Sequence, residues 1–335
     1  MAGVAGGTLA AEVYEAGGVG FIGGGHRPLD NLKEEVGKAR DVLGLSDTDE
    51  LPLGVGLILW RLESPCLNGP AAEIKAQGDL WLRYLLFVAR VRYLWLSFSN
   101  RGTEGLEEWV QRVRETEQLG PRKELEKERE RKERVRVMVM VQSEQAGKRA
   151  RDWDVDAVVA QGTESGGHGP TSEAGSPLLP LLKSLAPLYP ADSSPFLLAA
   201  GGLSSPSAIS TALSSGASAA VVGTSFEVAE ESLLPQPQKE FLVASTGGST
   251  SRGIRWDIAR DGANTWPEGV DGRALTNITS EEEEVDAAVA AERYKQAVQE
   301  KDVTRLVTWA GTGVGDVTSI RPAKDILRSL FPEGR

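Results

Sequence analysis

Short apolar segments alternate with longer helix-like segments along most of the chain. Several short segments are apolar nearly throughout, which is typical of parallel strands buried on both faces. The predicted strands are residues 19–22, 53–59, 93–98, 135–141, 157–160, 196–200 and 219–222. The predicted helices are residues 8–15, 29–43, 71–89, 106–117, 144–152, 178–188 and 207–214. Because glycine or proline marks nearly every junction, the pattern predicts an α/β fold of repeated strand–helix units.

Two features favour a TIM (β/α)8 barrel over a doubly wound open sheet. Glycines follow the carboxyl ends of several successive strands, at 23–25, 162–169, 201–202 and 223. A barrel gathers all these ends on one face, whereas an open sheet uses chiefly the ends at one crevice. No GxGxxG motif follows the first strand, so a dinucleotide-binding sheet has little support.

The pattern yields seven strands where a barrel needs eight. The opening MAGVAGG reads as a loop that leaves a strand and enters the first helix, yet no strand precedes it. Either the sequence is truncated or the barrel closes imperfectly. We therefore expect one domain over residues 1–335, a TIM barrel that lacks its first strand. Residues 281–335 are expected to form a helical segment packed on the barrel, and residues 121–134 a charged, solvated helical insert.

Composition excludes several classes of function. Apolar residues make up 40% and charged residues 25%, as in ordinary globular proteins, and the net charge of −11 argues against nucleic acid or an anionic membrane as partner. A single cysteine, Cys66, rules out an internal disulfide, and two histidines argue against a zinc site, so no metal is expected. The most apolar stretch, 80–98, contains three arginines, and no signal peptide pattern opens the chain. We expect an intracellular, cytoplasmic protein.

The run QGTESGGHG, residues 161–169, carries the main candidate chemistry. It follows an apolar predicted strand and contains His168, one of the two histidines. Its glycines predict a loop, neither helix nor strand, in which backbone amides can approach a ligand. A histidine in such a loop can move a proton near neutral pH.

A candidate phosphate site follows the last two predicted strands. Gly201 and Gly202 end one strand, Gly223 and Thr224 end the next, and a helix follows each pair. Amides at such positions, beside helix amino termini, favour an anion. In TIM barrels the loops after the seventh and eighth strands often hold a phosphate, and a phosphate-bearing cofactor such as FMN would satisfy this site.

Several segments resemble the FMN-dependent nitronate monooxygenases, formerly called 2-nitropropane dioxygenases. These are MAGVAGGTLAAEVYEAGGVGFIGGG at the start, GVGLILW at 54–60, QGTESGGHG, LLAAGGL, VVGTSF at 221–226 and WAGTGVG at 309–315. They occur in the family's order over most of the chain, outside the charged insert. The specific part is QGTESGGHG followed by AAGG and VVGT.

The resemblance implies a flavoprotein with a TIM-barrel fold and no metal. Such an enzyme oxidises alkyl nitronates with molecular oxygen to carbonyl compounds and nitrite, and His168 takes an α-proton from a neutral nitroalkane. The cofactor contacts that the resemblance implies are Gln161, Gly166 and Gly167 at the flavin, Gly201, Gly202, Gly223 and Thr224 at the phosphate, and Met1, Ala2 and Gly3 in the first flavin-contacting loop.

Other residues fit ordinary structural roles as well as functional ones. His26 follows a strand-end glycine run and is at least as well explained by an exposed loop. Trp60 and Tyr294 are expected to pack, and Cys66 lacks the glycine-framed loop of a nucleophile.

Three alternatives to a nitronate monooxygenase remain open. A flavin-dependent enoyl-thioester reductase shares the same barrel and glycines but needs NAD(P)H. A catalytically defective flavin-binding relative would account for the missing strand, because its loss exposes two sheet edges. A barrel aldolase or isomerase without flavin lacks a well-placed lysine or carboxylate pair in these loops. The sequence leaves the physiological substrate and the oligomeric state open.

Overall fold

Seven parallel strands form the central sheet of this computed structural model, which describes all residues except 26–27, 65–70, 120–133, 191, 283–284 and 333–335. The strands lie side by side in the order β1, β2, β3, β4, β5, β7, β8. Their bounds are β1 Phe21–Gly23, β2 Leu51–Ile58, β3 Val91–Ser97, β4 Arg136–Val141, β5 Ala157–Gln161, β7 Phe196–Ala200 and β8 Ala219–Val221. All seven predicted strands are thus confirmed, and no strand end differs from its predicted position by more than two residues.

The sheet curls around an interior of its own. Leu53, Val55 and Leu57 of β2 are fully buried in the core between the sheet and its helices. A second cluster fills the concave face with Met138, Met140, Ala157, Val159 and Ala200, flanked by residues of both edge strands, Phe21 of β1 and Val221 of β8. Since both edges contribute to one cluster, the strands are arranged as in a TIM barrel, as predicted.

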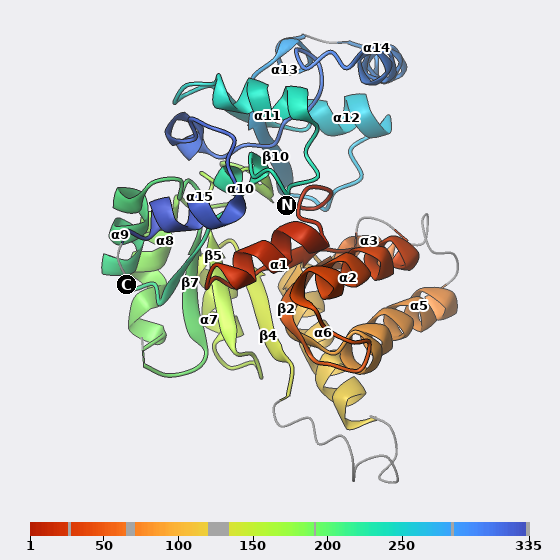
Figure 1. The fold of residues 1–335 in the computed structure, drawn as a ribbon, viewed down its shortest axis with the longest axis vertical. Helices are drawn as coiled ribbons and strands as arrows, with labels where there is room; N and C mark the ends of the chain where they lie inside the picture. Colours follow the sequence, from red (N-terminus) through yellow and green to blue (C-terminus); the bar gives the residue numbers. More distant parts are fainter. Residues whose placement is uncertain (26–27, 65–70, 120–133, 191, 283–284, 333–335) are drawn as a thin grey trace.

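Helices cover the outer face of the sheet (Figure 1). Their bounds are α1 Gly7–Glu15, α2 Leu29–Leu43, α3 Leu59–Glu63, α5 Ala71–Arg83 with a π-helical turn at Tyr84–Val88, α6 Gly102–Gln118, α7 Glu144–Ala150, α8 Leu178–Leu185 with a 3₁₀ turn at Ala186–Leu188, and α9 Pro206–Ser214. Apolar residues at helical spacing cause this packing: in α6, Leu106, Trp109 and Val113 are buried. No helix in the described parts of the chain combines the length and apolar character needed to cross a membrane.

No pairing joins β8 to β1 in the described chain, and residues 1–6 lie beside this edge. The amide of Gly23 in β1 donates to the carbonyl of Ala5 at 2.9 Å, and the amide of Leu233, after β8, donates to the carbonyl of Val4 at 2.9 Å. Helix α1 also packs against α15, Ala323–Leu330. The two ends of the chain therefore meet at the edge where a barrel would have another strand.

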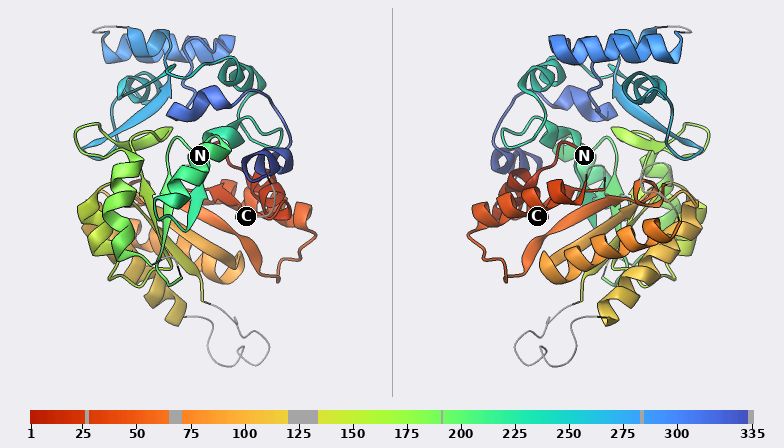
Figure 2. Two further views of the ribbon diagram at one scale, coloured as in Figure 1. Left: turned by 90° about the vertical axis from the view of Figure 1, so that its left-hand side faces the viewer. Right: turned by 90° about the vertical axis from the view of Figure 1, so that its right-hand side faces the viewer.

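A second, antiparallel sheet lies beyond the barrel and was not predicted. It consists of β6 Gly167–Pro170, β9 Thr250–Gly253 and β10 Val270–Leu275 in the order β6, β10, β9. With it lie α11 Gln236–Val243, α12 Arg255–Asp261, α13 Ile278–Glu281 and α14 Ala287–Glu300, which form one layer at an end of the barrel in every view (Figures 1 and 2). The prediction that all of QGTESGGHG is loop is wrong, because residues 167–170 pair with β10.

The remaining elements join this layer to the barrel. They are the short helix α10, Thr224–Glu227, directly after β8, and a 3₁₀ segment, Thr312–Asp316, before α15. The predicted carboxyl-terminal helical segment contains α14, the 3₁₀ segment and α15. Of the predicted charged insert, 121–134, only Arg134 is among the described residues.

Candidate active site

His168 lies on β6 with its side chain only 8% exposed. Its Nε2 atom is 2.9 Å from Oδ2 and 3.0 Å from Oδ1 of Asp257, a residue of α12 with no exposed surface. Arg260, one turn further along α12, donates from Nη2 to Oδ1 of Asp257 at 2.9 Å. The predicted catalytic residue is therefore part of a buried chain of charged and polar groups.

Aromatic rings surround the imidazole. Trp266 stacks on it with 3.6 Å between ring centres and a 9° angle between planes, and Trp309 lies at 4.6 Å, tilted by 59°. The edge of Trp266 contacts Trp60 and Phe98, each with ring centres 5.2 Å apart. Because Trp60 follows β2 and Phe98 follows β3, this aromatic cluster joins His168 to the carboxyl ends of barrel strands.

Burial decides the protonation state of His168. It lowers the pKa of the imidazole below the ordinary value, while the hydrogen bond and charge of Asp257 raise the pKa and the charges of Arg260 and Arg252 lower it. Since burial is the largest of these effects, the ring is neutral at neutral pH. A neutral imidazole can accept a proton, as a general base must.

Gln161, the last residue of β5, is held from both ends of its amide. Its Nε2 donates to the carbonyl of His168 at 3.1 Å, and its Oε1 accepts from Nε2 of Gln142 at 2.8 Å. The side chain of Gln161 therefore has one orientation, beside the strand that carries His168. Nearby Ser165 is buried, and its hydroxyl has no hydrogen-bond partner among the described residues.

The loop between β5 and β6 is fixed by contacts with three other segments. Arg252 of β9 and Arg273 of β10 both donate to the carbonyl of Thr163, at 3.3 and 3.1 Å. The carboxylate of Glu164 accepts from the amide of Leu178 at the start of α8, at 2.9 Å. The carbonyl of Glu164 accepts from the amide of Thr312 at 3.0 Å. This loop is thus tied to the second sheet, to a barrel helix and to the carboxyl-terminal segment.

The glycine pair after β7 requires glycine for two reasons. Gly201 and Gly202 have φ of +123° and +67°, values that side chains disfavour. A Cβ on Gly202 would also lie 2.9 Å from Oγ1 of Thr312. Within the described structure the amides of Gly202 and Gly223 have no acceptor, as expected of donors placed for an anion.

Gly166 and Gly167 serve different purposes. A Cβ on Gly166 would lie 2.4 Å from the amide nitrogen of Gly311, so glycine here permits close packing against the carboxyl-terminal segment. A Cβ on Gly167, where φ is +71°, would meet nothing within 4 Å. Thr224 completes the junction, because its Oγ1 accepts from the amide of Gly311 at 3.0 Å.

The predicted first flavin-contacting loop lies at the same end of the barrel. The Met1 carbonyl accepts from the amide of Ala5 at 3.0 Å, and the Met1 side chain is 3.8 Å from where a Cβ of Gly223 would be. A Cβ on Gly23 would lie 3.1 Å from Cα of Ala2. The structure therefore brings Met1 and Ala2 between the ends of β1 and β8.

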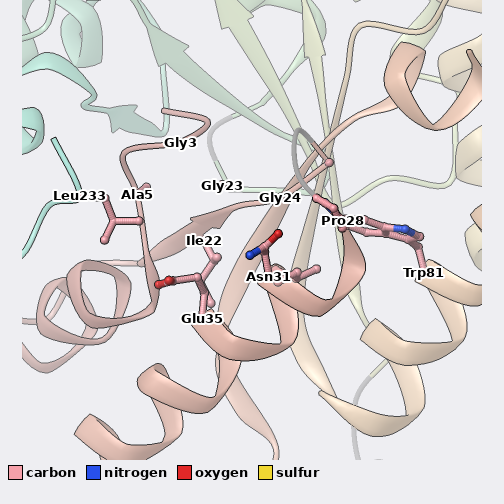
Figure 3. A pocket seen from close by; sticks show the side chains of 12 residues that line it. Gly3, Ala5, Ile22, Gly23, Gly24, Pro28, Asn31, Glu35, Trp81 and Leu233 are labelled. Atoms are coloured by element: carbon pink, nitrogen blue, oxygen red, sulfur yellow. The ribbon is translucent and has the colours of Figure 1, made fainter. Parts of the chain in front are cut away.

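A small cavity lies beneath Gly3, beside the first predicted flavin-contacting loop (Figure 3). Its lining includes Gly3, Gly23, Asn31 and Glu35, and its volume is about 20 Å³. That space suits about one water molecule. This cavity therefore does not hold a flavin.

The residues present fit a phosphate-bearing flavin. Free amides at Gly202 and Gly223 and the unpartnered hydroxyl of Ser165 lie on loops that follow β7, β8 and β5, and the open space at Gly167 lies at the start of β6. In the described ranges no three histidine, cysteine, aspartate or glutamate side chains gather as a metal site would require.

The remaining residues considered from the sequence have no functional role in the described structure or lie outside it. His26 and Cys66 lie outside the described residues. Tyr294 is buried and its hydroxyl accepts from the amide of Val307 at 3.2 Å, which is a packing role, as expected. Sequence reasoning missed Asp257 and Trp266, for which no motif gives a signal. A role for Trp309 could have been predicted, because this residue begins the WAGTGVG segment, which resembles the family.

Comparisons with known proteins show the family to which this chain belongs. The family model described as nitronate monooxygenase matches residues 1–333. A nitronate monooxygenase of Neurospora crassa is 30% identical over 346 residues, which cover 99% of this chain and 86% of that protein. Among solved structures, FabK from Thermotoga maritima superposes with a TM-score of 0.70 at 22% identity, covering 98% of this chain and 89% of that one. Nitroalkane oxidase from Streptomyces ansochromogenes gives 0.69 at 22% identity, with 98% and 91% covered. These two structures share the fold, and the family match with the Neurospora relative shows that the chain belongs to the nitronate monooxygenase family.

Proposed function

We propose that this chain binds FMN and uses molecular oxygen to oxidise alkyl nitronates, and the corresponding nitroalkanes, to carbonyl compounds and nitrite. The observation that carries the proposal is the position of His168. A neutral, buried imidazole lies in an aromatic enclosure at the carboxyl ends of barrel strands, next to loops with free amides. Family membership makes the chain an oxidoreductase that uses a flavin.

The cofactor would be held by residues from four loops. The amides of Gly201, Gly202, Gly223 and Thr224 would bind the phosphate, in keeping with the unpaired donors there. Gln161, Gly166 and Gly167 would lie along the ring, with Met1, Ala2 and Gly3 at the side of β1. Bound FMN supplies electron acceptance from the substrate and electron delivery to oxygen.

His168 would act on neutral nitroalkanes. Its neutral ring accepts the α-proton, and the surrounding tryptophans exclude water from the reacting atoms. A nitronate has already lost that proton, so its oxidation does not need the base.

The first test is an absorption spectrum of the purified protein, before and after anaerobic addition of an alkyl nitronate. We expect flavin bands that bleach on addition and return with oxygen, and nitrite in proportion to the oxygen consumed. The released cofactor should be FMN by mass.

Other outcomes separate the alternatives. Flavin that bleaches with NAD(P)H and not with a nitronate would replace the proposal with an enoyl-thioester reductase. Protein without flavin bands, even after incubation with FMN, would indicate a defective relative.

A further inference from the structure

The hydrogen bond between His168 and Asp257 restricts where the imidazole can accept a proton. An ionised carboxylate only accepts hydrogen bonds, so the Nε2 atom, 2.9 Å from Oδ2 of Asp257, must carry hydrogen. A neutral imidazole has one such hydrogen, and its other nitrogen has a free lone pair. In this structure that nitrogen is Nδ1, for which no hydrogen bond exists among the described residues.

The surroundings hold this arrangement in place. Arg260 donates from Nη2 to Oδ1 of Asp257 at 2.9 Å, and this charge-assisted hydrogen bond keeps the carboxylate oriented. Trp266 covers one face of the imidazole at 3.6 Å, and Trp309 packs at 4.6 Å. The ring therefore cannot turn over without moving two tryptophans.

We propose that Asp257 is a positioning residue, which holds His168 in the tautomer with hydrogen on Nε2 and so makes Nδ1 the proton acceptor for neutral nitroalkanes. This inference rests on the proposed function. In the step, the bond between the α-carbon and its hydrogen breaks, and its electron pair stays on the substrate, which becomes the nitronate. The proton forms a bond to Nδ1, and the resulting imidazolium lies against the carboxylate of Asp257.

The charges around His168 explain why a carboxylate is needed. Asp257 and Arg260 face the ring from α12, and Arg252 faces it from β9, where it also pairs with Asp271. These two guanidinium groups oppose a positive charge on the imidazole. Asp257 is the buried carboxylate in contact with the ring, and it offsets that opposition when the proton arrives.

The variant Asp257→Asn tests the tautomer. The asparagine oxygen keeps the hydrogen bond from Arg260, so the amide NH₂ turns toward Nε2 and favours hydrogen on Nδ1. We expect kcat/KM for a neutral nitroalkane to fall roughly a hundredfold or more, the scale of general base catalysis. Turnover of the preformed nitronate and the flavin spectrum should change little. Equal losses on both substrates would overturn the proposal.

Nitrogen NMR of the holoenzyme reads the tautomer without any turnover. With only two histidines in the chain, ¹⁵N-histidine labelling yields two ring systems, and His168 is identified by its loss in His168→Asn. We expect hydrogen on Nε2 in the wild type and on Nδ1 in Asp257→Asn. Hydrogen on Nδ1 in the wild type would overturn the proposal even if the enzyme oxidises nitronates, so this failure differs from failure of the proposed function.

Asp261→Asn is the matched control. Asp261 is on the same helix and binds the same arginine, Nη2 of Arg260, at 2.7 Å, but it makes no hydrogen bond to His168. We expect the wild-type tautomer and an unchanged ratio of nitroalkane to nitronate activity. If Asp261→Asn lowered the ratio of nitroalkane to nitronate activity as much as Asp257→Asn does, the effect would belong to Arg260. The proposed role of Asp257 would then be overturned.

Discussion

At the scale of single residues, the chemistry of this protein depends on a competition around one imidazole. Burial and two arginines favour the neutral ring, whereas Asp257 favours the charged ring. Burial is the largest effect, so His168 combines a free lone pair with a carboxylate ready to balance a proton. A surface histidine lacks the buried carboxylate that balances the proton.

The pH dependence of nitroalkane oxidation follows from this balance. A histidine pKa lowered from about 6.5 keeps the ring neutral as the pH falls through that value. We expect kcat/KM for a freshly dissolved neutral nitroalkane to stay constant from pH 8 to about 6.5. It should decrease only at lower pH. Steady-state rates across this range provide the measurement.

The control for this profile is His168→Asn. In this variant kcat/KM for the nitroalkane should be roughly 10²- to 10⁴-fold lower and should no longer decline at low pH. The variant should still bind FMN. A decline centred above pH 6.5 in the wild type would contradict the buried, neutral base.

At the scale of elements, the site depends on a segment far along the chain. Residues 310–312 contact the loops after three barrel strands: Gly311 donates to Thr224 after β8, and Thr312 donates to Glu164 after β5 and lies against Gly202 after β7. The carboxyl-terminal segment therefore sets the spacing between the candidate phosphate loops and the loop that leads to His168.

Replacing Thr224 with valine tests this junction. The change keeps the shape of the side chain but removes the acceptor for the buried amide of Gly311. We expect the free energy of unfolding to fall by about 1–3 kcal/mol, the usual cost of an unsatisfied buried donor. FMN should also bind more weakly. Urea unfolding and a flavin titration measure the two effects.

Thr211→Val provides the comparison for Thr224→Val. Thr211 is exposed on α9, and its hydroxyl bonds to the carbonyl of Ser207 within the same helix. We expect less than about 0.5 kcal/mol of change, as for most surface substitutions. Equal effects of the two variants would show that the junction does not support the loops.

At the scale of the whole molecule, the barrel and the second sheet are joined at the site. The aromatic cluster takes Trp60 and Phe98 from the barrel side and Trp266 and His168 from the other. The seven-stranded sheet is completed at its open edge by residues 1–6 and α15, next to β8 and the candidate phosphate loop. A ligand bound by the candidate phosphate loop and by residues 1–3 would thus contact both edge strands, β1 and β8.

Ligand binding should therefore stabilise the whole fold. For protein stripped of flavin, FMN at 100 times its Kd should add about 2.7 kcal/mol to the free energy of unfolding, and raise the melting temperature accordingly. Riboflavin, which has the same ring without the phosphate, should stabilise less at the same concentration. Thermal unfolding with each ligand measures the difference. Equal stabilisation by FMN and riboflavin would show that Gly202 and Gly223 do not bind the phosphate.

The barrel was predictable because strands buried on both faces leave continuous apolar runs, as in 137–141 and 157–160. The second sheet was not, because β6 reads Gly-His-Gly-Pro and shows neither an apolar run nor alternation. Its pairing partner β10 begins at Val270, 103 residues after the start of β6 at Gly167. Local pattern carries no information about such a pairing.

The sequence by itself determined the class of fold, the glycine loops at the strand ends and the candidate base, because each depends on residues close together in the chain. Only the tertiary structure decided which groups surround that base. Asp257 is 89 residues from His168 and Trp266 comes from a third segment, and antiparallel pairing of β6 with β10 brings their segments together. The state of a titratable group is set by burial and by charges within a few ångströms, and folding alone determines both.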